Sequence, residues 1–132
     1  MQLYLVRHAE AASGDPDELR PLTPEGREAA RELARRLAAE GVRPDAVLTS
    51  PLLRARETAA ELARPEGLEP EPDDRLAPGA SAEDVRAAAG KRGQIVVVVG
   101  HQPDCGKIAA ALTGGAEPAF PPAGMVAIDL PE

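Results

Sequence analysis

The stretch Ile95–His101, which reads IVVVVGH, decides the fold. Its first five residues are all β-branched, and such side chains pack well on a pleated sheet and lose rotamer freedom in a helix. A strand that is apolar on both faces is typical of the centre of a parallel sheet that helices cover on both sides. The stretch therefore predicts an α/β protein in which residues 95–99 form a central strand.

Strand and helix patterns alternate on both sides of this stretch. Thr23 and Pro24 form a typical helix start, with Thr as N-cap and Pro at the first helical position. The predicted strands cover residues 2–6, 46–49 and 125–129, and the predicted helices run from Thr23 to Gly41, from Ser50 to about Ala63, over 82–89 and from Pro103 to Gly114. Residues 64–80 are expected to be irregular, with one short edge strand. The alternation predicts a three-layer α/β/α sandwich with a mostly parallel central sheet and one antiparallel edge strand.

Length and composition narrow the classes of function. The chain has 132 residues, which fits a single domain over 1–132. Its net charge of −7 disfavours nucleic acid and anionic lipid as partners. There is no apolar run of membrane-spanning length, and the first residues do not read as a signal peptide. Cys105 is the single cysteine, so the chain forms no internal disulfide, in keeping with a predicted cytoplasmic location.

Residues with distinctive chemistry follow three of the predicted strands. Arg7 and His8 come directly after the first strand, Arg54 lies one turn into the helix after the second, and His101 follows the valine run. The carboxyl ends of parallel strands meet at the same edge of a sheet, which is where ligands bind in open α/β folds. We therefore expect both histidines of the chain and two of its arginines to surround one site.

These side chains suit the transfer of a phosphoryl group. Two guanidinium groups bind a phosphate dianion, and helix N-termini add backbone N–H donors. A neutral imidazole is a nucleophile toward phosphorus, and a second imidazole, if protonated, stabilises charge on the equatorial oxygens. The arrangement needs neither a metal nor another cofactor, because the cationic side chains supply the positive charge.

Three segments resemble the motifs of the histidine phosphatase superfamily, the phosphoglycerate mutase-like proteins. They are LVRHAE at 5–10, SPLLRARETA at 50–59 and VGHQP at 99–103, in family order and over most of the chain. The resemblance implies a phosphoglycerate mutase-like fold and a phosphatase that forms a phosphohistidine intermediate at His8. It also implies that Arg7 and Arg54 bind the phosphate and that His101 contacts the transferring group.

Within the superfamily, the chain resembles the SixA-type phosphohistidine phosphatases. The segments RPLT at 20–23 and LAPGA at 76–80 are similar to that subgroup, and the chain has no room for the insertions that cap the larger members. Phosphohistidine expels an imidazole, whose conjugate acid has a pKa of about 6.5, so little help from a proton donor is needed. The leading hypothesis is a metal-independent phosphohistidine phosphatase whose partner is a phosphorylated substrate, such as a phosphohistidine protein.

Several side chains are left without a firm role. Arg20 either reaches the phosphate and substrate or is a plain surface arginine. Cys105 is expected to be a packed thiol. Glu10, Ser13 and Asp15 either line the mouth of the site or, as expected, are solvated loop residues. No proton donor is assigned among Asp73, Asp74, Glu83 and Asp84.

Other functions remain open at this point. A phosphomonoesterase for a small metabolite would need an acid such as Glu83 or Asp84 near the site. A phosphoprotein-binding module without catalysis is disfavoured by the complete set of arginines and histidines. A metal-binding protein is disfavoured because two histidines without a cysteine cluster are a poor ligand set, and mutase activity is the least expected. The oligomeric state is expected to be a monomer or a weak homo-oligomer.

Overall fold

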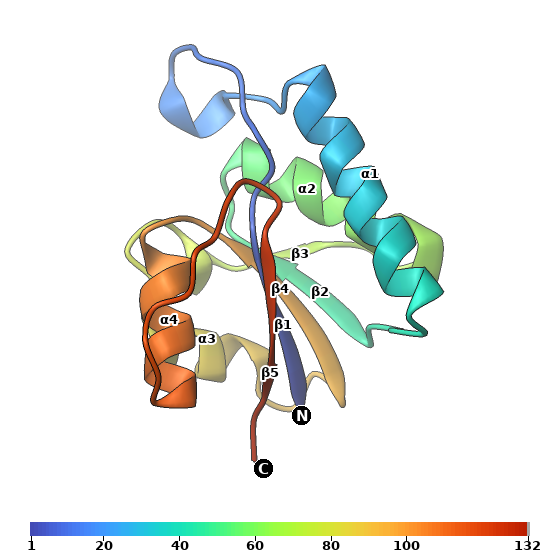
Figure 1. The fold of residues 1–132 in the computed structure, drawn as a ribbon. Helices are drawn as coiled ribbons and strands as arrows, with labels where there is room; N and C mark the ends of the chain where they lie inside the picture. The colour runs from blue at the N-terminus through green and yellow to red at the C-terminus, as the bar shows by residue number, and fades with distance from the viewer. Residues whose placement is uncertain (132) are drawn as a thin grey trace.

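The computed structural model describes residues 1–131, in which a mixed sheet forms the centre of the molecule (Figure 1). Its strands are β1 (Gln2–Arg7), β2 (Ala46–Thr49), β3 (Glu71–Pro72), β4 (Ile95–Gly100) and β5 (Met125–Asp129). They lie in the order β3-β2-β4-β1-β5. β4 is central and pairs in parallel with β1 and β2, whereas β5 is an antiparallel edge strand beside β1. The predicted central strand and antiparallel edge strand are confirmed.

Helices cover both faces of the sheet, as Figure 1 shows. The helices α1 (Pro24–Ala39) and α2 (Leu53–Ala63) lie on one face, and α3 (Ala82–Ala89) and α4 (Asp104–Thr113) lie on the other. Short 3₁₀ turns at Asp17–Leu19, Arg64–Glu66 and Asp74–Leu76 complete the regular structure. The predicted three-layer sandwich is therefore confirmed. Within residues 1–131, no helix has both the length and the apolar character needed to cross a membrane.

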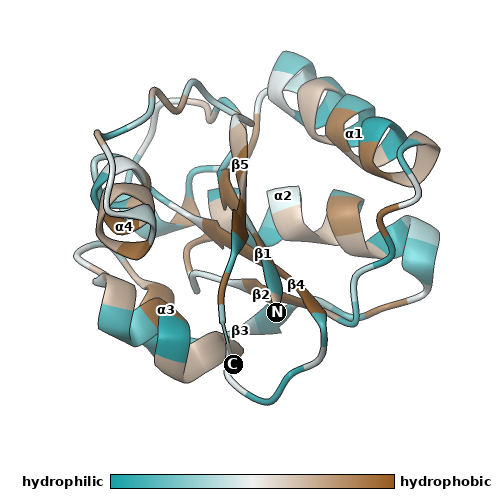
Figure 2. Ribbon diagram, turned by 60° about the horizontal axis from the view of Figure 1, so that its bottom comes forward, coloured by the Kyte–Doolittle hydropathy of each residue, from teal (hydrophilic) through white to brown (hydrophobic). Residues whose placement is uncertain are grey.

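The valine run of β4 explains why helices cover both faces of the sheet. Val96 and Val98 pack into the core that includes α3 and α4, and Val97 and Val99 pack into the core that includes α1 and α2. All four side chains are at most 1% exposed. Neighbouring residues of a strand point to opposite faces, so a continuous apolar run needs an apolar layer on each side. Figure 2 shows hydrophobic residues along the strands and hydrophilic ones on the outer helix surfaces.

The start of α2 differs from the predicted one at Ser50. The helix begins at Leu53, because the backbone N–H of Ser50 continues the sheet and donates to the carbonyl of Val99 at 3.0 Å. The Ser50 hydroxyl oxygen accepts from the N–H of Leu52 at 3.2 Å, within the turn that leads into the helix. Ser50 is completely buried and belongs to the strand end rather than to the helix.

A close approach at Gly26 positions α1 against the segment that follows β1. A Cβ atom at Gly26 would overlap the backbone carbonyl of Glu10. We expect Gly26→Ala to lower the free energy of unfolding by about 1–3 kcal/mol, since overpacking forces the backbone to move. Urea unfolding measures this loss. The matched control is Gly115→Ala, because a Cβ at Gly115 makes only ordinary contacts, and equal stability of the two variants would contradict the prediction.

Candidate active site

The two histidines meet because β1 and β4 are parallel neighbours in register. Arg7, the last residue of β1, is paired with Gly100, the last residue of β4, so His8 and His101 follow at the same level. The backbone N–H of His8 donates to the carbonyl of Gly100 at 3.0 Å. The centres of the two imidazole rings are 5.2 Å apart, with an angle of 59° between the planes.

A cleft of about 400 Å³ opens at this end of the sheet. Every candidate site residue of the sequence analysis lines it: Arg7, His8, Arg20, Arg54 and His101. The remaining lining residues are Glu10, Ala11, Pro78, Gln102 and Pro122. The structure therefore brings together side chains from the ends of β1 and β4, from the first turn of α2 and from the loop before α1.

The hydrogen bond to Ala9 fixes the orientation of the His8 ring, with Nδ1 toward the protein backbone. Its Nδ1 lies 2.7 Å from the carbonyl oxygen of Ala9, and because a carbonyl only accepts, Nδ1 must carry the proton. The other nitrogen, Nε2, then has a free lone pair. Burial lowers the pKa of His8 below its ordinary value and outweighs the opposing effect of the Ala9 hydrogen bond, and the positive charges of Arg54 and Arg7 lower it further. The imidazole is therefore neutral and nucleophilic near pH 7.

Thr58 holds the backbone beside His8. Its hydroxyl oxygen accepts from the N–H of Ala9 at 3.0 Å and donates to the carbonyl of Arg54 at 2.9 Å. Thr58 is fully buried, so this hydroxyl ties the residue after His8 to the helical turn that carries Arg54. The link fixes the nucleophilic imidazole relative to a cationic side chain.

His101 is only 5% exposed, and its Nε2 lies 2.7 Å from the hydroxyl oxygen of Ser50. Burial lowers its pKa to about 4, and the neighbouring His8 imidazole and the charge of Arg54 lower it further. His101 is therefore uncharged near neutral pH in the free protein. A protonated His101 was expected to stabilise charge on the equatorial oxygens, but in the free protein this imidazole is neutral.

The three arginines are positioned largely by backbone carbonyl groups. Arg7 donates from Nη1 to the carbonyl of Phe120 at 3.0 Å, and Arg54 donates from Nη1 to the carbonyl of Asp17 at 2.9 Å. Arg20 donates from Nη1 to the carbonyl of Ala12 at 3.1 Å. Neutral carbonyls orient a guanidinium without cancelling its charge, so the cleft keeps its positive character.

Asp17 bridges two of these arginines. Its carboxylate accepts from Nε of Arg20 at 2.9 Å and from Nη2 of Arg54 at 3.3 Å. The hydrogen bond from Arg20, together with the charge of Arg54, holds the pKa of Asp17 below its ordinary value. The ion pair fixes the relative position of Arg20 and Arg54 at the cleft.

Several buried side-chain nitrogen atoms of cleft-lining residues have no hydrogen-bond partner among residues 1–131. Buried nitrogen atoms without a hydrogen bond among the described residues are Nε of Arg7, Nε of Arg54, Nε of Arg56 and Nδ1 of His101. All of these except the nitrogen of Arg56 belong to residues that line the cleft. Buried polar groups normally have partners, and an anion is one explanation for a cluster that lacks them. The arrangement is suited to a tetrahedral oxyanion placed against His8.

Three residues of this site did not emerge from the sequence: Asp17, Ser50 and Thr58. Ser50 and Thr58 belong to the segment 50–59, whose resemblance to a family motif was the available signal. Asp17 lies in a polar segment between β1 and α1, where the sequence gives no sign that it pairs with Arg54. Glu10 is exposed and lies in a loop, as expected, and it also lines the cleft.

The candidate proton donors named from the sequence lie outside the cleft. Asp73 pairs with Arg75 at 2.7 Å, and Asp84 accepts hydrogen bonds from Ser81 in the capping box of α3. Asp74 and Glu83 are also absent from the cleft lining. Among residues 1–131, Glu10 is the one carboxylate that lines the cleft, and its Oε1 accepts from the hydroxyl of Thr23 at 2.8 Å.

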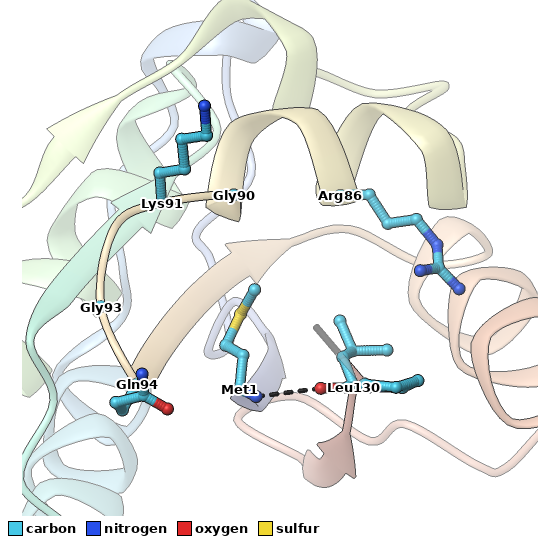
Figure 3. Close-up of a pocket in the computed structure, with 8 residues that line it drawn as sticks. Met1, Arg86, Gly90, Lys91, Gly93, Gln94 and Leu130 are labelled. Atoms are coloured by element: carbon cyan, nitrogen blue, oxygen red, sulfur yellow. Dashed lines mark hydrogen bonds between the residues drawn. The ribbon is translucent and has the colours of Figure 1, made fainter.

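A larger cavity of about 590 Å³ lies at the opposite end of the sheet (Figure 3). It is lined by residues that include Met1, Arg86, Lys91 and Leu130 and by none of the candidate site residues. Figure 3 shows that the side chains of Arg86 and Lys91 do not point toward one another, so they form no common anion site. Within residues 1–131, no group of three or more His, Cys, Asp or Glu side chains is placed to hold a metal ion.

Comparisons with known proteins agree with this geometry. Residues 3–78 match the model of the histidine phosphatase superfamily (branch 1), and this match spans more than half of the chain. The matched stretch contains Arg7, His8 and Arg54, and His101 lies beyond it.

Full-length relatives extend the similarity to nearly the whole chain. The phosphohistidine phosphatase SixA of Escherichia coli is 33% identical over 127 residues, which cover 89% of this chain and 78% of that protein. An uncharacterized protein of Picosynechococcus sp. is 40% identical over 126 residues, which cover 87% of this chain and 74% of that protein. The structure of the protein histidine phosphatase SixA complexed with tungstate superimposes with a TM-score of 0.89 at 30% identity, covering 98% of this chain and 88% of that one. The chain therefore belongs to branch 1 of the histidine phosphatase superfamily, as a phosphatase similar to SixA.

Proposed function

We propose that this phosphatase removes phosphate from phosphohistidine, with a protein as its substrate. The observation that carries the proposal is a single cleft lined by Arg7, Arg54 and both imidazoles, whose ring centres are 5.2 Å apart, with Nδ1 of His8 engaged by Ala9. The similar SixA structure was determined with tungstate, a tetrahedral oxyanion like phosphate, and the similar protein of E. coli is a phosphohistidine phosphatase.

The proposed reaction has two displacements at phosphorus. The substrate phosphohistidine first takes up a proton from solvent on its unphosphorylated ring nitrogen. Nε2 of His8 attacks the phosphorus atom, the bond from phosphorus to the substrate ring breaks, and the ring leaves with the bonding electron pair as neutral imidazole. Water then attacks the phosphohistidine at His8, which releases inorganic phosphate and restores the neutral imidazole. Arg7 and Arg54 hold the equatorial oxygens in both steps, so positioning and electrostatics supply most of the rate enhancement.

The scarcity of acids in the cleft favours phosphohistidine over a phosphate ester. An alkoxide leaving group needs a positioned proton donor, which contributes about 10²–10⁴-fold to the rate. Glu10 is the one carboxylate lining the cleft in the described part of the chain, and it is engaged by Thr23. An imidazole leaving group has a conjugate acid of pKa about 6.5 and departs without such a donor.

An exposed apolar side chain beside the cleft favours a protein substrate. Leu19 is 57% exposed, and it is the one large hydrophobic side chain among the described residues with such exposure. It directly precedes Arg20, which lines the cleft. Because Leu19 adjoins a cleft-lining residue, a phosphoprotein at the cleft offers it an apolar partner, which a small phosphorylated metabolite does not. The proposed partner is therefore a phosphohistidine protein. We also propose that the enzyme acts in the cytoplasm, as a monomer or a weak homo-oligomer.

A substrate panel tests the proposal. We expect kcat/KM for a phosphohistidine peptide to exceed that for a sugar phosphate by at least about tenfold. A difference of this size would reflect stronger stabilisation of the transition state for the phosphohistidine peptide. Equal or reversed values would favour the phosphomonoesterase alternative, for which Glu10 would be the proton donor. In that case Glu10→Gln would lower sugar phosphate turnover by about 10²-fold or more, whereas we expect less than a tenfold loss with either substrate.

The lowered pKa of His8 predicts the acid side of the pH profile. The nucleophile must be neutral, so kcat/KM is on its plateau above the pKa of His8 and falls as pH decreases through it. Because burial lowers this pKa, the fall begins below the ordinary histidine value of about 6.5. Steady-state rates on phosphohistidine peptide between pH 4 and 8 measure it. A plateau that begins only above pH 7 would contradict the assignment of a desolvated imidazole.

A further inference from the structure

One direction of the hydrogen bond between Ser50 and His101 gives the Ser50 hydroxyl proton an acceptor, and the other direction leaves it without one. The Ser50 hydroxyl oxygen already accepts from the N–H of Leu52 at 3.2 Å. A hydroxyl has one proton to donate, and Nε2 of His101, 2.7 Å away, is the one hydrogen-bond partner of the Ser50 hydroxyl among residues 1–131 that can accept it. If Nε2 carried a proton instead, the hydroxyl would accept twice and its own proton would have no acceptor. Thr49 donates its own hydroxyl to the Ser50 carbonyl at 3.0 Å, so it does not compete for the Ser50 hydroxyl.

We propose that Ser50 is a positioning residue that donates to Nε2 of His101 and holds this neutral imidazole in its Nδ1–H tautomer. The proton on a neutral imidazole occupies the nitrogen that is not accepting a hydrogen bond. His101 then presents an N–H to the phosphoryl group as an uncharged donor. This inference rests on the proposed function, because it assigns the N–H of His101 to a bound phosphoryl oxygen.

The unpartnered nitrogen of His101 supports this assignment. Nδ1 is buried and has no hydrogen-bond partner among the described residues, although the ring lines the cleft beside His8. Ser50 is completely buried and does not line the cleft, so Nε2 is directed into the protein. A buried N–H at Nδ1 acquires a partner when an anion binds, and that gain contributes to phosphoryl binding.

The charges around His101 are consistent with an uncharged donor. His8, Arg54 and Arg7 oppose a positive charge on His101, and Asp17 alone favours one. Protonation would also require Nε2 to take up a proton where it accepts one from Ser50. In the free protein, both imidazoles then share the same tautomer: His8 donates from Nδ1 to Ala9, and His101 carries its proton on Nδ1.

Nitrogen NMR of the ¹⁵N-labelled protein tests the tautomer without any substrate. The chain has two histidines, so the long-range ¹H–¹⁵N spectrum contains two imidazole patterns. At pH 7 we expect both patterns to be those of the neutral Nδ1–H form. An Nε2–H pattern for His101 in the wild-type protein would overturn the proposal. Because no turnover is measured, this result is independent of which phosphorylated substrate the enzyme uses.

Variants at Ser50 distinguish a role in orienting the His101 imidazole from a purely structural role in the fold. In Ser50→Ala, we expect His101 to move toward the Nε2–H form, whereas His8 keeps its pattern and is the internal control. kcat on phosphohistidine peptide should fall about tenfold, less than the ~10²–10³-fold loss for outright removal of a transition-state donor. Ser50→Thr keeps the hydroxyl, and we expect it to restore the Nδ1–H pattern and most of kcat. An unchanged His101 pattern in Ser50→Ala would also overturn the proposal, and the wild-type spectrum decides even if a variant fails to fold.

Discussion

His8→Ala is expected to lower kcat on phosphohistidine peptide by at least about 10⁴-fold, because loss of a nucleophile removes the covalent route entirely. The imidazole is neutral, its Nδ1 is fixed by Ala9, and its Nε2 faces the cleft lined by the arginines. No other side chain in the cleft is placed to replace it: the ring of His101 is engaged by Ser50. Steady-state kinetics on wild type and variant measure the loss.

The variant must be shown to fold, because His8 is partly buried beside the sheet. We expect the circular dichroism spectrum and the urea midpoint of His8→Ala to remain close to those of the wild type. A folded variant that keeps a tenth of the normal turnover would show that the nucleophile is another group.

Arg54→Ala has the second largest expected effect, a loss of about 10³-fold in kcat/KM, since a charged donor to the transferring group stabilises the transition state in a water-poor site. Arg54 is 7% exposed, and its Nη1 and Nη2 are held by Asp17, which leaves Nε directed to no protein partner. The loss should appear in kcat as well as in KM, because negative charge is spread over the three equatorial phosphoryl oxygens in the transition state, where Arg54 stabilises it.

Two further variants distinguish charge from geometry at Arg54. Arg54→Lys keeps the charge without the planar fork of donors, and we expect it to recover only part of the loss. Asp17→Asn removes the ion pair with Arg54 and keeps the arginine, so its loss should be below about tenfold, because the carboxylate of this pair is exposed to solvent. If Asp17→Asn were as damaging as Arg54→Ala, the defect would arise from the loop that carries Asp17, and direct phosphate binding by Arg54 would be contradicted.

The fold was largely predictable because its strongest signals are local. The β-branched run of β4 allows little else than a central strand, and the strands β2 and β5 and the helix α3 have the predicted bounds. Thr23 caps α1 through its hydroxyl, which accepts from the N–H of Gly26 at 2.9 Å. The start of α2 was wrong by three residues, because Ser50-Pro51 reads as a helix start while the Ser50 N–H pairs with β4.

The candidate site was predictable where residues follow strand ends directly. The parallel register of β1 and β4 places Arg7, His8 and His101 at the same edge of the sheet. The two apolar strand patterns predict this arrangement if both strands belong to one parallel sheet. Contacts that depend on loop shape were not predictable. The bridge from Asp17 to Arg54 joins residues 37 positions apart, and the bond from Ser50 to His101 joins residues 51 positions apart. Neither pairing leaves a periodic or local trace in the sequence.

The most direct test of the account is to trap the phosphorylated enzyme and locate the phosphate. Wild-type protein is mixed with phosphohistidine peptide, quenched in alkali within the first turnover and analysed by peptide mass spectrometry. We predict a single phosphate on His8 that is stable in alkali and lost in acid, and we predict none on the His8→Ala protein. A phosphate on any other residue, or turnover during which no phosphorylated enzyme forms, would contradict the central claim that His8 attacks phosphorus.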